Sequence, residues 1–162
     1  GRQGQGRRAG VGVVAKGRVA YFIENIDYSG PATRALLVEP LHRATFPDYD
    51  MVDVWNGHWW LAWSQGKPVA FAGMWSSRSE DSGGYLCRAG VVDGHRGRGL
   101  QRRLIRARER KARALGWRVM FTDTLRDNAA SANNLIACGY RVFLPKVPWG
   151  GPDAVYWRKA LS

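Results

Sequence analysis

Residues 89–116, AGVVDGHRGRGLQRRLIRARERKARALG, contain the strongest structural signal in this chain. The segment starts with small and β-branched residues and passes through a loop containing Gly94, Gly97 and Gly99. It then becomes an arginine-rich segment that ends at Gly116. This order predicts a strand, a glycine loop and a helix. A helix N-terminus has free N–H groups and a positive dipole end, so the loop is predicted to bind an anion.

The glycine spacing excludes two common anion loops. A P-loop requires Gly-Lys-Ser/Thr where this chain has Gly99 followed by Leu100 and Gln101. The dinucleotide fingerprint requires a third glycine where Arg102 stands. A phosphate or pyrophosphate site of another type remains, because glycine allows a ligand to approach the backbone closely. A plain glycine-rich turn is the alternative. The added positive charge would come from Arg96, Arg98 and Arg102.

The surrounding segments predict a mixed α/β single domain. Strand-like composition occurs at 18–27, 59–65, 69–77, 84–92, 117–125, 140–144 and 154–161, with a hairpin turn at 66–68. Helical segments are expected at 29–47, 100–116 and 128–139, and Pro40 predicts a kink or break in the first. The core-facing residues of the basic helix are predicted to be Leu100, Leu104, Ala107, Ala114 and Leu115.

Length and composition limit the class of protein. The chain has 162 residues, which suffice for one sizeable core. No apolar run reaches membrane-spanning length. The Gly/Arg/Gln-rich residues 1–17 lack a signal-peptide core and a starting Met, so we interpret them as a flexible basic arm, an expression remnant or a trimmed start. Residues 18–162 would form the domain.

Cysteine and histidine usage favours a reducing, cytoplasmic setting without a metal. The two cysteines, Cys87 and Cys138, form no disulfide framework and have no metal-type spacing. The three histidines are scattered, and none lies at ligand spacing from a cysteine or a second histidine. We therefore predict no metal site.

The net charge of +12 is localised. Residues 1–18 carry five bases and no acid, and residues 96–118 carry ten bases and only Glu109. A basic tail and a basic helix are typical of nucleic-acid binding. The simpler interpretation is a solvated helix face and an unstructured arm, and we favour it.

Several motifs together resemble the GNAT superfamily of N-acetyltransferases. RGRGLQ at 96–101 is similar to the family's acetyl-CoA loop, Arg/Gln-x-x-Gly-x-Gly/Ala, except that Gln101 replaces the final small residue. WWLAWSQGKPVAFAGMW at 59–75 resembles the family's second and third strands, and FTDTLRDNAASANNLIACGY at 121–140 resembles its fifth strand and fourth helix. The resemblance extends over most of residues 18–160. It implies a twisted, mostly antiparallel sheet flanked by helices.

The resemblance also implies acetyl-CoA as the cosubstrate. Backbone groups of Ala89, Gly90 and Val91 would line the pantetheine arm and the thioester. Asn128 would contact the cosubstrate from the following helix. Catalysis would then depend on positioning the acetyl group between two strands. The loop residues implied to hold the pyrophosphate are Arg96, Gly97, Arg98, Gly99, Leu100, Gln101 and Arg102.

Acetyl transfer to an amine needs a neutral nitrogen, a polarised carbonyl and a proton for the leaving thiolate. A backbone N–H near Val91 would polarise the carbonyl. Many family members supply the proton from a tyrosine seven residues after the asparagine, where this chain has Leu135. Asp123, where some members have a carboxylate, is the candidate base. Tyr85 and Arg88 lie in the same neighbourhood with little specific signal. The substitutes for the acid are Ser131, Asn134, Cys138 or unassisted departure.

The acceptor is predicted to be a primary amine of a small molecule or protein. Acidic and aromatic residues gather at 46–60, and together they suit a cation; core packing is the stronger interpretation for the strand tryptophans. The alternatives are an acceptor on RNA and a degenerate protein that binds CoA or nucleic acid without turnover. A homodimer through a sheet edge or a Trp-rich face is a further hypothesis. The residues concerned are Asp48, Tyr49, Asp50, Asp53, Trp55, Trp59, Trp60 and, in a later loop, Trp149.

Overall fold

A computed structural model describes residues 20–77 and 82–162, and the predicted arm at 1–17 lies outside these ranges. One seven-stranded sheet has the order β1-β2-β3-β4-β5-β7-β6, and every neighbouring pair is antiparallel except β4 and β5. This confirms the mixed α/β class and the mostly antiparallel sheet. The elements are β1 (Phe22–Asn25), α1 (Thr33–Leu36), α2 (Val38–Thr45), β2 (His58–Ser64), β3 (Lys67–Ser76), β4 (Gly83–Val91), α3 (Leu100–Ala114), β5 (Val119–Leu125), α4 (Ala129–Ala137), β6 (Arg141–Val142) and β7 (Ala154–Ala160).

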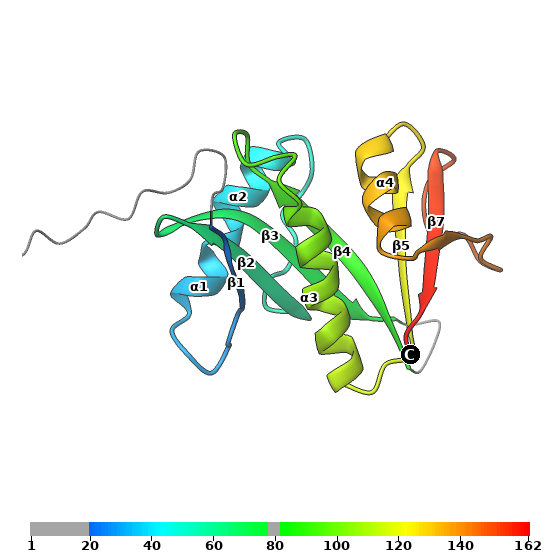
Figure 1. The fold of residues 1–162 in the computed structure, drawn as a ribbon, viewed down its shortest axis with the longest axis horizontal. Helices are drawn as coiled ribbons and strands as arrows, with labels where there is room; N and C mark the ends of the chain where they lie inside the picture. Colours follow the sequence, from blue (N-terminus) through cyan, green and yellow to red (C-terminus); the bar gives the residue numbers. More distant parts are fainter. Residues whose placement is uncertain (1–19, 78–81) are drawn as a thin grey trace, which may run out of the picture.

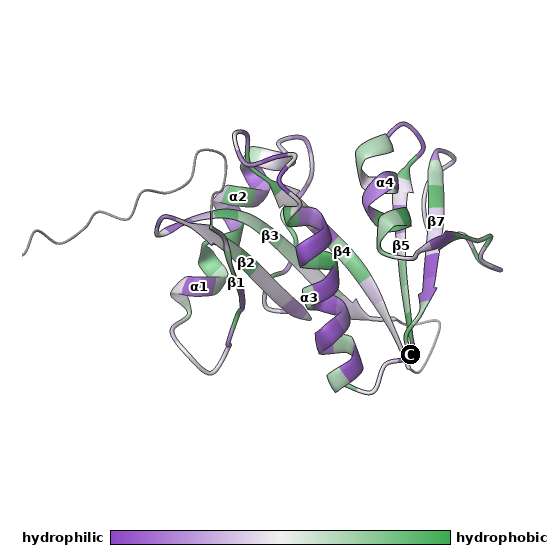
Figure 2. Cartoon of the chain, viewed as in Figure 1, coloured by the Kyte–Doolittle hydropathy of each residue, from purple (hydrophilic) through white to green (hydrophobic). Residues whose placement is uncertain are grey.

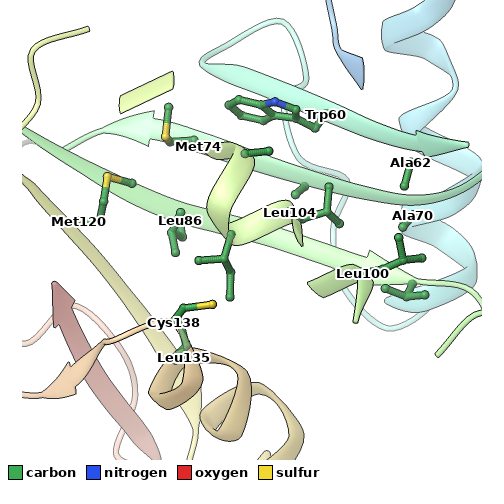
Figure 3. Close-up of a cluster of buried hydrophobic side chains, with 14 of the residues drawn as sticks. Trp60, Ala62, Ala70, Met74, Leu86, Leu100, Leu104, Met120, Leu135 and Cys138 are labelled. Carbon is green, nitrogen blue, oxygen red and sulfur yellow. The ribbon is translucent and has the colours of Figure 1, made fainter. Parts of the chain in front are cut away.

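Two apolar clusters cover the two faces of the sheet. Side chains from α3 and α4 pack on one face, where Leu100, Leu104 and Leu135 meet residues of β2 to β5 (Figure 3). Side chains from α1 and α2 pack on the other face against Trp59 and Phe71. The helices therefore form outer layers around the sheet (Figure 1).

Helix α3 is amphipathic, but its buried face differs from the predicted one. Leu100, Leu104 and Ala107 are buried as expected, whereas Ala114 and Leu115 are exposed because the helix runs past the edge of the core there. The outward face carries arginines and is strongly hydrophilic (Figure 2). The buried face also holds Arg108 and Glu109, which were not among the predicted core-facing residues. The basic stretch is thus mainly a solvated helix face with two internal charges.

Local turn chemistry explains the other departures from the predicted elements. The β2–β3 hairpin turns at Gln65 and Gly66, both with positive φ, one residue earlier than predicted. The predicted 29–47 helix breaks at Leu37, so Pro40 lies in the first turn of α2, where its missing N–H has no intrahelical role. The strand predicted at 140–144 pairs only over Arg141–Val142.

Strands β4 and β5 form a fork. They pair only at Gly83–Val119, Gly84–Met120 and Tyr85–Phe121. Beyond these pairs the hydroxyl of Thr122 donates to the Leu86 carbonyl at 2.8 Å, and the two strands then diverge (Figure 1). The rest of β4 pairs with β3 alone, so backbone groups on its other edge are available to a ligand.

Candidate active site

The glycine loop leads directly into the N-terminus of α3. Gly97 and Gly99 have φ of +71° and +79°, which side-chain-bearing residues rarely adopt. Gly99 is the N-cap residue and supplies no side-chain cap, and the first backbone bond of the helix runs from Arg103 N to Gly99 O at 3.1 Å. The amides of residues 100–102 therefore lack an intrahelical acceptor. The first turn contains no acid. This end of α3 is suited to an anion.

The loop arginines differ in their contacts. Arg96 donates to the Val91 carbonyl through Nε at 3.0 Å and pairs with Asp93 at 3.1 Å, so it is tied back onto the end of β4. Arg102 donates through Nε to Asn134 Oδ1 at 3.0 Å and so bridges α3 and α4. Arg98 is exposed. All three arginines lie within a few residues of the free amides in the sequence, so they add positive charge to this part of the chain.

A cavity of about 400 Å³ lies between this loop, the end of β4 and the start of α4. Most of the predicted cosubstrate residues line it: Ala89, Gly90, Val91, Arg96, Gly97, Gly99, Leu100, Gln101 and Asn128. Arg98 and Arg102 lie outside the lining, and the ligand contacts of all these residues stay a prediction. The cavity also has walls that the sequence did not indicate, namely Thr45, Phe46, His95 and Ala130, and it includes Ser131 and Asn134, two of the candidate substitutes for the acid.

Asn128 has a structural task in this wall. It is the N-cap of α4, and its side-chain oxygen accepts from the Ser131 amide at 3.1 Å. Its amide donors are then the groups left for a ligand. Leu135, at the position where the family resemblance implied a tyrosine, is buried in the core and provides apolar packing. Among the proposed substitutes for the acid, Ser131 and Asn134 line the cavity. Burial raises the pKa of the Cys138 thiol, which lies in the core.

Asp123 lies beyond the fork, on the sheet face opposite α4. Its Oδ1 accepts the hydroxyl hydrogen bond of Tyr85 and the indole N–H of Trp149, the latter at 3.0 Å. Burial and then the Asp123 carboxylate raise the pKa of Tyr85, so the phenol stays protonated and donating. Trp149 packs edge-on against Tyr156 with ring centroids 4.6 Å apart. The half-buried Asp123 carboxylate is thus held by hydrogen bonds from two aromatic side chains.

Two arginines lie at the β3–β4 bulge near the fork, on opposite faces of the sheet. The β3–β4 register shifts between Ala72 and Met74, and the buried Arg108 donates to the carbonyls of Gly73 and Cys87 at 3.1 and 3.4 Å. Arg108 therefore anchors α3 to the bulge from the α3 face. Arg88, the next residue along β4, turns toward α2.

The comparison with family models decides the identity of this arrangement. The model of the acetyltransferase (GNAT) family matches residues 24–140, which include the glycine loop, the fork and all of the cavity lining. This chain belongs to the acetyltransferase (GNAT) family. The resemblance inferred from the sequence motifs is confirmed.

Solved structures support the fold of this acetyltransferase. The ribosomal-protein-S18-alanine N-acetyltransferase from Escherichia coli superposes with a TM-score of 0.70 at 14% identity, covering 88% of this chain and 95% of that one. A Bacillus subtilis acetyltransferase in complex with CoA gives 0.68 at 16%, covering 88% and 100%. A Salmonella typhimurium protein solved with its cofactor acetyl-CoA gives 0.65 at 22%, covering 88% and 95%. No curated protein sequence shows a significant match.

The acidic and aromatic residues expected on the acceptor side of the acetyltransferase separate into two groups. Trp59 and Trp60 are buried core residues, as the stronger interpretation held. Tyr49 and Asp50 contact Arg88, and Trp149 contacts Asp123.

Within residues 20–77 and 82–162, no helix is long and apolar enough to span a membrane.

Proposed function

We propose that this protein transfers the acetyl group of acetyl-CoA to a primary amine. The observation that supports this most strongly is the cavity, which connects the free amides of α3 with the open edge of β4 in a chain of this family. A pyrophosphate fits the first region because backbone N–H groups and arginines converge there. An extended amide-containing arm fits the second because unpaired strand edges bind such arms through the backbone.

Two parts of the chain would have separate roles, one in binding the cosubstrate and the other in proton transfer. The loop and the N-terminus of α3 bind the nucleotide end, and the backbone at 89–91 orients the thioester. Asp123 is on the other side of the fork, where it would accept a proton from the incoming ammonium, directly or through a water. Tyr85 and Trp149 both donate to Oδ1, and no donor among the described residues bonds Oδ2, so Oδ2 is the proposed acceptor.

The chemical step balances without another reagent. The ammonium first gives one proton to Asp123, which passes it to water. The neutral nitrogen then forms the new C–N bond, the C–S bond breaks, and the second proton that nitrogen loses goes to the CoA thiolate. A backbone N–H near Val91 is the predicted donor to the carbonyl oxygen as negative charge develops on it. Acetyl-CoA supplies the acyl group, and the protein supplies position and proton transfer.

The test pairs cosubstrate binding with turnover. We expect calorimetric titration to give saturable one-site binding of acetyl-CoA, with weaker binding of pyrophosphate alone. Thiol release with an amine panel should fall about 10²- to 10⁴-fold in Asp123→Asn, with acetyl-CoA affinity unchanged. Asn keeps a carbonyl oxygen for Tyr85 and Trp149, so the fold is retained.

Three outcomes would contradict the proposal in different ways. Absence of acetyl-CoA binding would remove the cosubstrate. Binding without thiol release with any amine would indicate a degenerate binder. Binding to RNA or DNA with a steep salt dependence, and none to acetyl-CoA, would favour the nucleic-acid hypothesis. If changing Arg96, Arg98 and Arg102 together to Glu left acetyl-CoA binding intact, the pyrophosphate assignment would be wrong.

A further inference from the structure

We propose that the acceptor amine also carries a carboxylate, and that Arg88 binds that carboxylate while Asp123 receives the amine. The inference rests on the proposed function and specifies the substrate class of the same site. It follows from two opposite charges that the fold holds on one face of the sheet beside the fork, each with hydrogen-bonding capacity left over.

Arg88 is held in a fixed orientation. Its guanidinium lies 5.3 Å from the ring centre of Phe46 and 4.8 Å from that of Tyr49, both of which follow α2. Its Nη1 atom lies 2.7 Å from His42 Nε2 and 3.3 Å from the Asp50 carbonyl oxygen. Arginine has no acceptor, so the His42 ring must accept, which makes that ring neutral. Burial and Arg88 both lower the pKa of His42, which agrees with this.

The other edge of the guanidinium is available. Among the residues that the structure describes, no carboxylate lies within 4.0 Å of Arg88, and neither its Nε nor its Nη2 donates a hydrogen bond. These two nitrogen atoms can bind one carboxylate through two parallel hydrogen bonds. Arg34 provides a contrast, because it stacks on Trp63 at the same 4.8 Å but pairs with Glu24. A half-buried, oriented and unpaired arginine is suited to an anionic group of a ligand.

Asp123 provides the complementary charge. The Tyr85–Phe121 pair places Asp123 level with Cys87, and Tyr85 reaches its carboxylate from β4. Tyr85 and Arg88 are three residues apart on β4, roughly 10 Å along the strand. Both contact side chains on the α2 side of the sheet, because the bulge lies between them. An amine at Asp123 and a carboxylate at Arg88 can therefore belong to one small molecule.

The acidic residues of the 46–57 loop suggest a competing acceptor. Asp48, Asp50 and Asp53 would attract a purely cationic amine such as a polyamine. Arg88 opposes that acceptor because it presents a positive charge at the sheet surface between this loop and Asp123. Asp50 itself contacts Arg88 through its backbone carbonyl rather than its carboxylate. The structure thus favours the amino-carboxylate, and the polyamine becomes an outcome of the test.

The experiment compares acceptors that differ only at the carboxylate. The full chain and acetyl-CoA are assayed for thiol release with the twenty proteinogenic amino acids, the carboxamide of each, and spermidine. We expect at least one amino acid to exceed its carboxamide by about tenfold or more in kcat/KM, the worth of a charged hydrogen bond. Arg88→Gln should remove that preference mainly through KM, and Arg88→Lys should restore part of it. Arg34 is the matched stacked arginine, and Arg34→Gln should leave kcat/KM unchanged for both the amino acid and its carboxamide.

The outcomes separate this inference from the proposed function. Equal rates with acids and carboxamides, or a preference for spermidine, would overturn the inference while the acetyltransferase activity stands. Acetyl-CoA binding without transfer to any amino acid would also overturn it. The comparison of acid with carboxamide uses the unmodified protein, so it tests the inference even if the Arg88→Gln variant fails to fold. Loss of acetyl-CoA binding in the unmodified protein would instead contradict the proposed function.

Discussion

The ion pair between Glu109 and Lys159 should contribute more to stability than a surface ion pair, because the carboxylate is buried and both of its oxygens lie 3.0 Å from Nζ. Glu109 is 3% exposed, and its Oε2 lies 3.0 Å from Lys159 Nζ on β7. It also accepts from the Tyr140 hydroxyl at 3.0 Å. The pair therefore fastens the middle of α3, whose N-terminus is the proposed anion site, to the far half of the sheet.

The magnitude follows from the geometry and the burial. At 3.0 Å and an effective dielectric of about 20, the attraction is about 5 kcal/mol before desolvation. Lys159→Met removes the cation and leaves Glu109 buried with the Tyr140 hydroxyl as its remaining hydrogen-bond donor among the described residues, which should cost about 3–5 kcal/mol. It also frees the Cys138 carbonyl, which accepts from Nζ at 2.6 Å. Combining it with Glu109→Gln removes the stranded charge, so the double variant should be more stable than Lys159→Met.

Urea unfolding of the two single variants and the double variant measures this coupling. The matched control is the exposed pair Glu39–Arg43 on α2, where Glu39→Gln should cost less than about 0.5 kcal/mol. We expect Lys159→Met to lower the free energy of unfolding by several times the control value. A loss for Lys159→Met no larger than for the control, or a double variant less stable than both single variants, would refute the reasoning.

Three further predictions concern the loop, the bulge and pH. Gly99→Ala should cost about 1–2 kcal/mol of stability, because φ is +79° while a Cβ would meet open space, and it should weaken acetyl-CoA binding in calorimetry. Arg108→Met should cost about 2–4 kcal/mol in urea unfolding, because it strands buried carbonyls at the bulge. The His42 pKa lies below 6.5 in the folded chain, through burial and then Arg88, so unfolded chains take up protons first as pH falls below 6.5. Stability should therefore decrease toward pH 5, and His42→Asn should reduce that slope but leave the part from His58, whose pKa is also lowered, by burial and then Lys111.

The elements predicted most accurately are those with strong local signals. The glycine loop and the start of α3 agree with the prediction because positive φ and a helix N-terminus depend on residue types close together in the sequence. The β2–β3 hairpin was also found, although its turn lies one residue earlier. The errors at Ala114 and Leu115 have a common cause: helical periodicity gives the face of a residue but not where the neighbouring sheet ends.

The site divides in the same way. Sequence motifs identified the family and most of the residues that line the cavity, because these belong to one continuous stretch and to Asn128. They could not show that Tyr85 and Trp149 both donate to Asp123, since these partners lie 38 and 26 residues away. They also assigned little signal to Arg88, because its value depends on a bulge and on His42, 46 residues earlier.

The sequence by itself therefore determined the class of the fold, the glycine loop before α3 and the family. Each depends on residue types at short, fixed spacing, where backbone conformation and hydrogen bonding are local. The tertiary structure alone decided which charges are buried, which are paired and which remain available at the fork. Those properties depend on strand register, the β4 bulge and the packing of α2 and α3, which bring side chains distant in the chain within hydrogen-bonding distance.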